Sequence, residues 1–433
     1  MCALTLNAVG EAHLAAWLEG ATDAKPATSN QSALGMPFQR WFKFKEAFAP
    51  SFVVESVRRL PYRPDSCCDP FGGSGTTALT CQFLGIEPTT IEVNPFMADV
   101  AEAKLTSYDI AELKYAFRTV ARQARKSLGA RGCAPSFSGA PATFIEPGLK
   151  GRWIFSRAVA RAILSLRSAI DAVPDPANAR LLRVALGSRL IDLSNVVING
   201  KGRRYRRGWE KRLVTPEHVF ASFDAASTNA ISDVEAFRSR RCKKYLLLRG
   251  DARLLTPKAG PVDFVLTSPP YPNSFDYTDI YNIELWALGY LGCGADNRAL
   301  RTQTLRSHVQ IIHEGAAATE ITPTLRKTYQ ALCSRRAQLW NRNIPEMVCH
   351  YFTDMKAVLA GCHSILRDGG HAMLAVGDSR YEGVLIDVPR ILTEIAADIG
   401  FELVKTEAVR SMRSSAQQGG NHVLNESLVW LTS

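Results

Sequence analysis

The feature that most constrains the fold of this chain is an alternation between short apolar runs and helix-like segments. Residues 66–69 form an apolar run that ends in the glycine-rich turn 70–75 (PFGGSG). Residues 76–84 follow as a predicted helix, and residues 89–93 form a second predicted strand. Strands that alternate with helices in this way favour an open, mostly parallel sheet with helices on both faces. The sequence therefore predicts an α/β fold.

The same alternation returns in the second half of the chain. Strands are predicted at 244–249, 262–266, 371–377, near 402–408 and near 426–431, and helices at 346–366 and 388–399. Between the two halves the rhythm is lost. That part contains two predicted helices, at 154–170 and 181–193, and a linker rich in Gly, Pro, Ser and Ala at 130–150.

We therefore expect one α/β domain that an insertion divides into two parts. At about 100–200 residues per domain, 433 residues allow about two to four domains. The expected boundaries are an N-terminal segment at 1–35, a first part at 36–105, a basic and mostly helical insertion at 106–240, and a second part at 241–433. A further helical insertion is expected within the second part, at about 275–345.

The positive charge of the chain is concentrated in one internal stretch. The chain carries 52 Lys and Arg against 41 Asp and Glu, a formal net charge of +11. Residues 151–250 hold 20 basic and 8 acidic side chains, a balance of +12, so the rest of the chain is near neutral at −1. A basic region on a near-neutral scaffold is typical of proteins that bind a polyanion. A charged surface that keeps a protein soluble has the same composition, so composition leaves both readings open.

Other features of the composition argue against several classes of protein. No run approaches the ~18 uninterrupted apolar residues of a membrane-spanning helix. The N-terminal sequence MCALTLNAVGEAHL lacks the basic residues that precede the apolar stretch of a secretory signal. The ten cysteines include no Cys-x-x-Cys pair, and the histidines show no metal-ligand spacing. We expect a cytoplasmic protein with neither a membrane nor a metal partner.

The first chemical motif is the glycine-rich stretch 69–77 (DPFGGSGTT). Glycines let the backbone approach a ligand closely, and the start of the following helix favours a negative group such as a carboxylate. The spacing differs from Gly-x-Gly-x-x-Gly, so the dinucleotide-binding pattern is not met. Glu92 ends the second strand, where an acidic side chain can accept hydrogen bonds from ribose hydroxyls. The turn and the acidic strand end together predict a nucleoside-binding site.

The second chemical motif is 267–271 (TSPPY), which follows the strand predicted at 262–266. Ligands of open α/β sheets bind at the carboxyl ends of the strands. Two successive prolines fix the backbone and lack N–H groups, so carbonyls and the Ser268 hydroxyl can face outward as hydrogen-bond acceptors. The ring of Tyr271 lies next to them in the sequence. Acceptors beside a flat ring suit an exocyclic amine on a planar base.

Both motifs resemble those of one family of enzymes. Residues 69–77 resemble the S-adenosylmethionine motif of amino-methylating DNA methyltransferases, and residues 267–271 resemble their catalytic motif. Residues 40–50 (RWFKFKEAFAP) and 276–286 resemble the flanking segments of the cytosine-N4-specific members. The resemblance covers roughly 36–105 and 240–433 and implies a Rossmann-like class I methyltransferase sheet. It also implies that the insertion at 106–240 is the candidate DNA-recognition region. The chain departs from the usual family orders, because this large insertion falls between the second and third strands.

The resemblance implies roles for individual residues. The methionine part of S-adenosylmethionine would be surrounded by Asp69, Phe71, Gly73 and Gly75, and Phe42 belongs to the segment that helps to enclose it. Glu92 would hold the ribose. The adenine would be contacted by Asp251 and Ala252. The catalytic site would consist of Ser268, Pro269, Pro270 and Tyr271.

The implied reaction is direct methyl transfer to the exocyclic amine of a base that has been flipped out of duplex DNA, with Tyr271 as the stacking surface. The chain has no Pro-Cys dipeptide, whereas carbon-5 cytosine methyltransferases use a cysteine nucleophile in that context. Ser268 favours cytosine N4 as the acceptor, because adenine-N6 enzymes more often carry Asp or Asn at this position. Adenine N6 is the alternative acceptor.

Two other function classes are weaker readings of the same sequence. RNA amino-methyltransferases usually carry an appended RNA-binding module, and none is recognisable here. A non-catalytic DNA-binding regulator would not need the motif at 267–271. By analogy with the family, a partner restriction or defence nuclease is also expected.

The basic segment 201–212 (KGRRYRRGWEKR) is the best candidate for contact with DNA phosphates, and Tyr205 or Trp209 could stack on a base or wedge between bases. The predicted phosphate contacts are Lys201, Arg203, Arg204, Arg206 and Arg207. A second, flexible DNA contact is expected at Arg410, Arg413 and residues 414–420.

Overall fold

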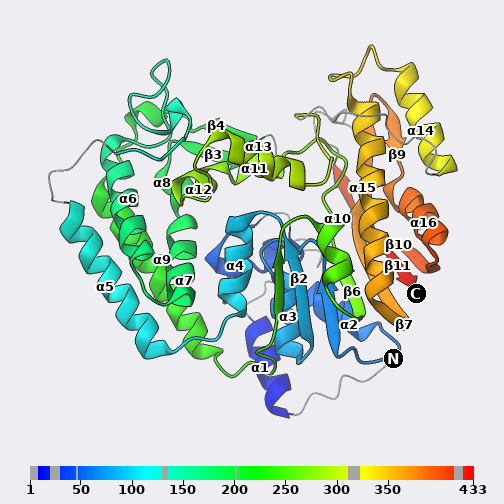
Figure 1. The fold of residues 1–433 in the computed structure, drawn as a ribbon, viewed down its shortest axis with the longest axis horizontal. Coiled ribbons are helices and arrows are strands. Elements are labelled where there is room, and N and C mark those ends of the chain that lie inside the picture. Colours follow the sequence, from blue (N-terminus) through cyan, green and yellow to red (C-terminus); the bar gives the residue numbers. More distant parts are fainter. Residues whose placement is uncertain are drawn as a thin grey trace.

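The computed structural model describes residues 8–19, 30–44, 47–128, 135–199, 202–310, 322–413 and 423–433. At its centre lies a seven-stranded sheet with the strand order β10-β11-β7-β6-β1-β2-β5 (Figure 1). The strands are β1 (Ser66–Asp69), β2 (Glu87–Glu92), β5 (Leu246–Arg249), β6 (Val262–Thr267), β7 (Leu366–Gly377), β10 (Glu402–Arg413) and β11 (Val423–Thr432).

Most strands of this sheet run parallel to one another. β1 pairs in parallel with β2 and β6, β2 with β5, and β6 with β7. β11 runs antiparallel to both β7 and β10. The predicted mostly parallel α/β sheet is therefore confirmed. Because the parallel strands share one direction, their carboxyl ends meet at one edge of the sheet.

Helices cover both faces of the sheet. Successive residues of a strand point to opposite faces, so a strand that is apolar throughout needs an apolar layer on each side. Cys67 and Phe264 belong to one apolar cluster, whereas their neighbours Cys68 and Val265 belong to a second cluster. The first cluster includes residues of α2 (Pro50–Arg58), α3 (Thr76–Leu84) and α4 (Pro95–Leu105). The second includes residues of α10 (Ala252–Leu255), α15 (Ile344–Ile365) and α16 (Val388–Ile399). The chain thus builds the two apolar layers that an α/β sheet requires.

The region inserted between β2 and β5 is mostly helical. Beyond α4 it contains α5 (Ile110–Leu128), α6 (Arg157–Asp171), α7 (Pro176–Gly187), α8 (Leu190–Leu193), α9 (Pro216–Ala236) and the hairpin β3 (Val196–Asn199) and β4 (Gly202–Tyr205). Figure 1 shows these helices to one side of the sheet, and α7 packs on α4. The helix predicted at 181–193 is divided into α7 and α8. The long helices α5 and α9 are additional to those predicted.

The segment before α2 ties this insertion to the sheet domain. The carboxylate of Asp233, on α9, accepts hydrogen bonds from the backbone N–H of Phe38 and from the indole Nε1–H of Trp41, both at 2.9 Å. The guanidinium of Arg40 forms an ion pair with the same carboxylate. Asp233 is 3% exposed, so its charge is neutralised and hydrogen-bonded inside the protein.

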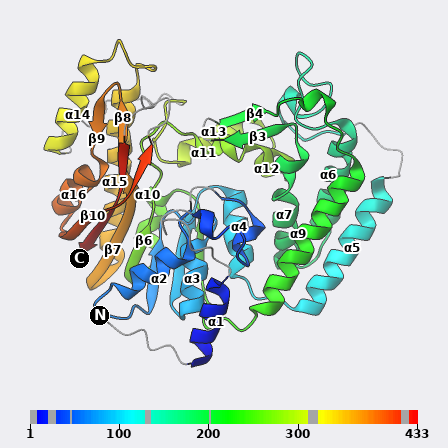
Figure 2. The same cartoon turned by 180° about the vertical axis from the view of Figure 1, so that it is seen from behind.

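A second helical insertion lies between β6 and β7. It contains α11 (Tyr277–Ile280), α12 (Asn282–Ala287), α13 (Gly294–Gln303) and α14 (Pro323–Ser334). Figure 2 shows α11, α12 and α13 beside the β3–β4 hairpin, and α11 contacts β4. The remaining elements are α1 (Ala8–Leu18), which packs on α3, and the small hairpin β8 (Ser379–Tyr381) and β9 (Val384–Ile386).

The described residues were also compared with the requirements for disulfides, membrane spans and metal sites. Their cysteines carry free thiols. None of their helices is both long enough and apolar enough to cross a membrane. No group of three or more His, Cys, Asp or Glu side chains among them is arranged to hold a metal ion.

Candidate active site

The two sequence motifs meet at the carboxyl ends of adjacent strands. β1 ends at Asp69 and β6 at Thr267, and the two strands are hydrogen-bonded neighbours. A cavity of about 480 Å³ lies at this edge, a volume typical of small-molecule sites. The predicted site residues that line it are Asp69, Phe71, Gly73, Glu92, Asp251, Ala252, Ser268, Pro269, Pro270 and Tyr271. Two segments that lie far apart in the chain therefore share one cavity.

The glycine-rich turn brings its backbone against this cavity. Gly73 has a φ of 50°, and a Cβ there would lie 2.8 Å from the ring of Phe44, so a larger residue would not fit without a shift. α3 begins directly after the turn, and Thr76 and Thr77 of its first turn also line the cavity. The start of a helix favours a negatively charged group. Gly75 is the residue that precedes α3, with its backbone against Ala101, and it does not line the cavity.

Asp69 connects the glycine-rich turn to the end of β6. Its carboxylate accepts hydrogen bonds from the hydroxyls of Thr77 and Thr267, each at 2.7 Å, and from the backbone N–H of Phe71 at 3.0 Å. Burial raises the pKa of Asp69, and these three hydrogen bonds oppose the rise because they stabilise the ionised form. Asp69 thus holds the two motifs in register in addition to lining the cavity.

Glu92, at the end of β2, is hydrogen-bonded to the glycine-rich turn. Its carboxylate accepts hydrogen bonds from the backbone N–H groups of Gly73 and Asn94, both at 2.7 Å. Burial raises the pKa of Glu92 to about 7, while these hydrogen bonds lower it and the charge of Asp69 raises it further. Each carboxylate oxygen has more than one lone pair, so the ionised side chain can accept further hydrogen bonds from a ligand.

Asp251 lines the cavity from the end of β5. Its carboxylate forms an ion pair with the guanidinium of Arg253, with 2.6 Å between Oδ2 and Nη2, and accepts the backbone N–H of the same residue. Arg253 also pairs with the buried Asp354 at 3.1 Å. This chain of ion pairs fixes the position of the Asp251 carboxylate, and Ala252 lines the cavity next to it.

The loop after β6 is held in place beyond its two prolines. The carbonyl of Pro272 accepts a hydrogen bond from the hydroxyl of Tyr381 at 3.0 Å, and the N–H of Ser274 donates to the carbonyl of Ser307 at 2.9 Å. Within this loop, Ser268 is half-buried and lines the cavity. The backbone that follows the motif 267–271 is therefore fixed by hydrogen bonds to two other segments of the chain.

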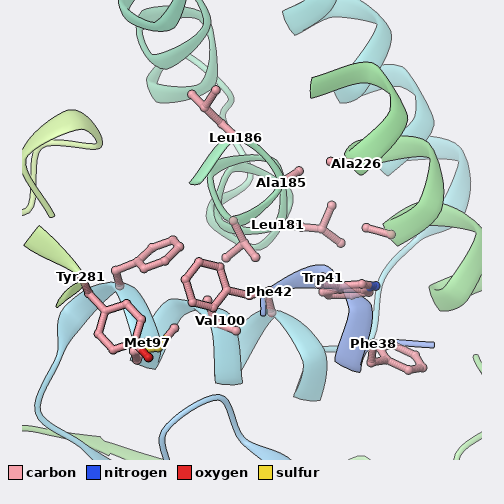
Figure 3. Close-up of a cluster of buried hydrophobic side chains, with 14 of the residues drawn as sticks. Phe38, Trp41, Phe42, Met97, Val100, Leu181, Ala185, Leu186, Ala226 and Tyr281 are labelled. Atoms are coloured by element: carbon pink, nitrogen blue, oxygen red, sulfur yellow. The ribbon is translucent and has the colours of Figure 1, made fainter. Parts of the chain in front are cut away.

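Phe42 was expected beside the cofactor, but it does not line the cavity. It is 7% exposed and packs in the first core cluster, where its ring contacts Phe96 at 5.1 Å and Tyr281 at 5.9 Å between ring centroids. Figure 3 shows it among Leu181, Val100 and Tyr281. Phe44 and Phe48 from the same segment line the cavity instead.

The arginines of the segment 201–212 differ in their surroundings. Arg206 donates hydrogen bonds to backbone carbonyls at the end of α8, at 2.9 and 3.2 Å, so its side chain stabilises the insertion. Arg204 and Arg207 are exposed, and Arg203 is half-buried on β4. Lys201 lies outside the described residues, as do residues 414–420.

Three titratable side chains of the cavity were not among the predicted site residues. His308 is 3% exposed, and burial lowers its pKa. Asp378 follows β7, and burial together with the charge of Asp387 raises its pKa to about 6. Glu426, on β11, is 3% exposed and forms an ion pair with Arg410 of β10, which also lines the cavity. Two of the three carried a sequence signal: Asp378 directly follows a predicted strand, and Glu426 is a charged residue in an apolar strand.

The residues of the cavity fit S-adenosylmethionine. The rings of Phe44, Phe48 and Phe71 offer apolar walls, and the carboxylate of Glu92 offers acceptors for ribose hydroxyls. The start of α3 offers backbone N–H groups for a carboxylate. Polar groups of the required kinds thus converge on one cavity of suitable size.

Comparisons with known proteins give a concordant result. Type II methyltransferase M.AvaI of Nostoc sp. is 24% identical over 440 residues, which cover 92% of this chain and 86% of that protein. Type II methyltransferase M.BsoBI of Geobacillus stearothermophilus is 23% identical over 457 residues, covering 93% of this chain and 86% of that protein. The chain is similar to type II methyltransferases along nearly its whole length. This similarity supports a methyltransferase, with S-adenosylmethionine as the methyl donor.

Three further comparisons gave a short match, a weak structural similarity and no match, respectively. Type II methyltransferase M.MjaII of Methanocaldococcus jannaschii is 41% identical over 71 residues, or 16% of this chain and 13% of that protein. Among solved structures, TrmN from Thermus thermophilus aligns with a TM-score of 0.30 and 13% identity, over 89% of this chain and 48% of that one. No protein-family model matches the sequence.

Proposed function

We propose that the protein is a site-specific DNA methyltransferase that transfers a methyl group from S-adenosylmethionine to the exocyclic N4 amine of cytosine. The observation that carries this proposal is the shared cavity. Asp69 and Glu92, the predicted cofactor residues, and the acceptor motif Ser268–Tyr271 line one space of about 480 Å³. The relatives that match along nearly the whole chain are type II methyltransferases, which supports the same reaction class.

The acceptor motif supplies what an exocyclic amine needs in order to react. The lone pair of such an amine is delocalised into the ring, so the nitrogen is a weak nucleophile. Hydrogen bonds from the amine to the Ser268 hydroxyl and the Pro269 carbonyl would draw the nitrogen toward a tetrahedral shape and localise its lone pair. Bound S-adenosylmethionine supplies an electrophilic methyl group. The contribution of the protein is then orientation and fixed dipoles, and no protein nucleophile is required.

Access to this cavity requires the target base to leave the duplex. A base within stacked DNA cannot reach a cavity at the edge of a sheet, so base flipping is part of the proposal. The ring of Tyr271 lines the cavity beside Ser268 and supplies a flat surface for the flipped base. Ser268 favours cytosine as that base, and adenine methylated at N6 is the alternative.

The nucleoside product tests the proposal directly. The full-length chain is incubated with S-adenosylmethionine and unmethylated plasmid DNA, and the DNA is digested to nucleosides for mass spectrometry. We expect N4-methyl-2′-deoxycytidine. N6-methyl-2′-deoxyadenosine in its place would establish the alternative acceptor. Methylation of structured RNA but not of DNA would overturn the proposal.

DNA binding is proposed to involve the β3–β4 hairpin, where Arg204 is exposed and Arg203 half-buried, and the residues directly after it, where Arg207 is exposed. Each phosphate contact that is removed lowers the slope of log K against log[salt] by about 0.9. Replacing Arg204 and Arg207 with Gln should therefore weaken DNA binding and flatten its salt dependence. Replacing Arg390, an exposed arginine on α16, is the matched control. A salt slope that the double substitution leaves unchanged contradicts this assignment.

The same relatives support a proposed biological setting for the reaction. Type II methyltransferases are the modification enzymes of restriction–modification systems, so a partner nuclease that cuts the unmethylated sequence is part of the proposal. Cells that express the protein should then resist a nuclease with the same recognition sequence. Mapping the methylated base and its neighbours in DNA from such cells would identify that sequence.

A further inference from the structure

The tyrosine of the acceptor motif is bonded to an ion pair from the other end of the chain. Its hydroxyl donates a hydrogen bond of 2.8 Å to Oε1 of Glu426, on β11. The same carboxylate accepts two hydrogen bonds from Arg410, on β10, through Nε and Nη2. All three side chains line the cavity.

Strand register places this ion pair at the edge of the sheet where the cavity lies. Arg410 and Glu426 are directly paired across β10 and β11, and Glu426 is paired with Gly377 at the carboxyl end of β7. The Glu426 side chain is 4% exposed, whereas that of Arg410 is 27% exposed. A carboxylate in so buried a place has its charge balanced by the guanidinium, and its hydrogen bond to the tyrosine is charge-assisted.

The prolines of the motif fix the backbone but not the side-chain torsions of Tyr271. A phenol ring that is attached only at its Cβ can change its rotamer, and a hydrogen bond at the far end of the ring restricts that change. A stacking surface gives catalytic benefit only if it holds the base at the correct angle to the methyl donor. The hydroxyl bond to Glu426 supplies this second point of attachment.

We propose that Glu426, held by Arg410, is a positioning residue that sets the ring of Tyr271 as the stacking surface for the target base. The inference rests on the proposed function, because it gives Tyr271 its role. It extends the acceptor half of the site to the β10–β11 hairpin, more than a hundred residues further along the chain. Glu426 acts through Tyr271 and does not need to touch the reacting atoms.

A double-mutant cycle tests this coupling. Tyr271→Phe keeps the ring and removes the hydroxyl, and Glu426→Gln keeps the size of the side chain and removes the charge. We expect each to lower kcat on saturating unmethylated plasmid DNA by about tenfold, which is about 1.4 kcal/mol. Because both substitutions weaken the same bond, the double variant should lose no more than about twofold beyond the worse single variant. The dissociation constant for S-adenosylmethionine, measured by calorimetry, should remain within about twofold of the wild-type value in all three.

Each contrary result has a defined meaning. Losses of kcat that multiply to about a hundredfold in the double variant would show independent roles and overturn the inference. So would wild-type kcat in Glu426→Gln, or an equal loss of cofactor affinity, which would indicate a general structural role. If the wild-type protein methylates no DNA at all, the proposed function itself fails and the inference fails with it.

Glu407→Gln is the matched control for this cycle. Glu407 lies on the same hairpin, at a position in β10 near Arg410, and is also paired with basic side chains, those of Arg59 and Lys405. It does not line the cavity. Its substitution should leave kcat unchanged and shift the melting temperature no more than Glu426→Gln does. A comparable loss of kcat in this control would overturn the inference, because it would trace the effect to the hairpin rather than to the bond with Tyr271.

Discussion

The two halves of the cavity are built in different ways. The half that fits the cofactor is formed mainly by one short stretch of chain. In it the turn 70–75 follows β1, Glu92 ends the neighbouring strand β2, and the N–H of Gly73 donates to Glu92. The half that faces the acceptor motif combines 268–275 with Ser307, His308, Asp378 and the β10–β11 hairpin. A local arrangement is encoded in one motif, whereas a composite one depends on the packing of the whole sheet.

This difference predicts that substitutions will separate binding from chemistry. Residues of the local half should affect the affinity for S-adenosylmethionine. Residues of the composite half should affect kcat with little change in that affinity. A single residue that altered both equally would break the comparison.

The largest effect is a loss of kcat, expected for Ser268→Ala. Loss of one fixed hydrogen-bonding group at a reacting centre costs about a hundredfold or more in kcat. The affinity for S-adenosylmethionine should be unchanged, because this side chain belongs to the acceptor half. Single-turnover methylation of plasmid DNA and calorimetry measure the two quantities. Ser364→Ala, on the distant helix α15, is the control and should retain full activity.

A smaller effect, a loss of affinity for S-adenosylmethionine, is expected for Glu92→Gln in the cofactor half of the cavity. The amide has one acceptor oxygen in place of two, so it cannot accept from both Gly73 and Asn94 as well as from ribose hydroxyls. Hydrogen bonds to charged groups contribute about 1.5–3 kcal/mol, so the dissociation constant should rise about ten- to hundredfold. Glu87→Gln, at the exposed start of the same strand, is the matched control. Unchanged cofactor affinity in Glu92→Gln would remove Glu92 from the cofactor site.

The smallest effect is a dependence of the affinity for S-adenosylmethionine on pH, which also arises from Glu92. Its pKa in the folded protein is about 7, above the ordinary value of 4.5, because burial disfavours the charged form. Only the ionised carboxylate can accept hydrogen bonds through both oxygens. The affinity for S-adenosylmethionine should therefore rise, by less than about tenfold, as the pH increases from 6 to 8. Calorimetry at several pH values should show this rise in the wild-type protein and not in Glu92→Gln.

The raised pKa of Glu92 also affects the free energy of unfolding, which should fall as the pH rises, whereas the cofactor affinity should increase. Between about pH 4.5 and 7 the folded protein holds a proton at Glu92 that the unfolded chain has released. The contribution of Glu92 to the free energy of unfolding is therefore fully present below pH 4.5 and is lost as the pH rises through 7. The stability of wild-type protein relative to Glu92→Gln should fall over this interval. A difference that stays constant with pH would contradict the raised pKa.

The sequence predicted the parts of the molecule whose signals are local. The turn 70–75, the helix that follows it and the motif at 267–271 each carry their pattern within a few residues. The strand alternation was sufficient to predict the sheet. Glu426 could not be matched to Tyr271 from sequence, because their contact depends on the antiparallel register of β11 against β7.

Phe42 illustrates a different limit of the sequence. The segment 40–50 contains several aromatic residues, and periodicity does not tell which of them face a ligand. The N–H of Phe44 donates to the carbonyl of Phe42, which closes a three-residue turn between them. This turn directs Phe42 into the core and leaves Phe44 at the cavity. Such a turn has no signature in the residues that form it here.

The contact between Asp233 and residues 38–41 has a consequence for engineering. The chain that leads into the wall of the cavity is anchored to a helix of the inserted region. Exchanging the insertion for that of another protein would remove this carboxylate and leave the buried indole of Trp41 and the guanidinium of Arg40 without their acceptor. A chimera that keeps α9, or that restores an acid at this position, is the one we expect to retain a formed cofactor pocket.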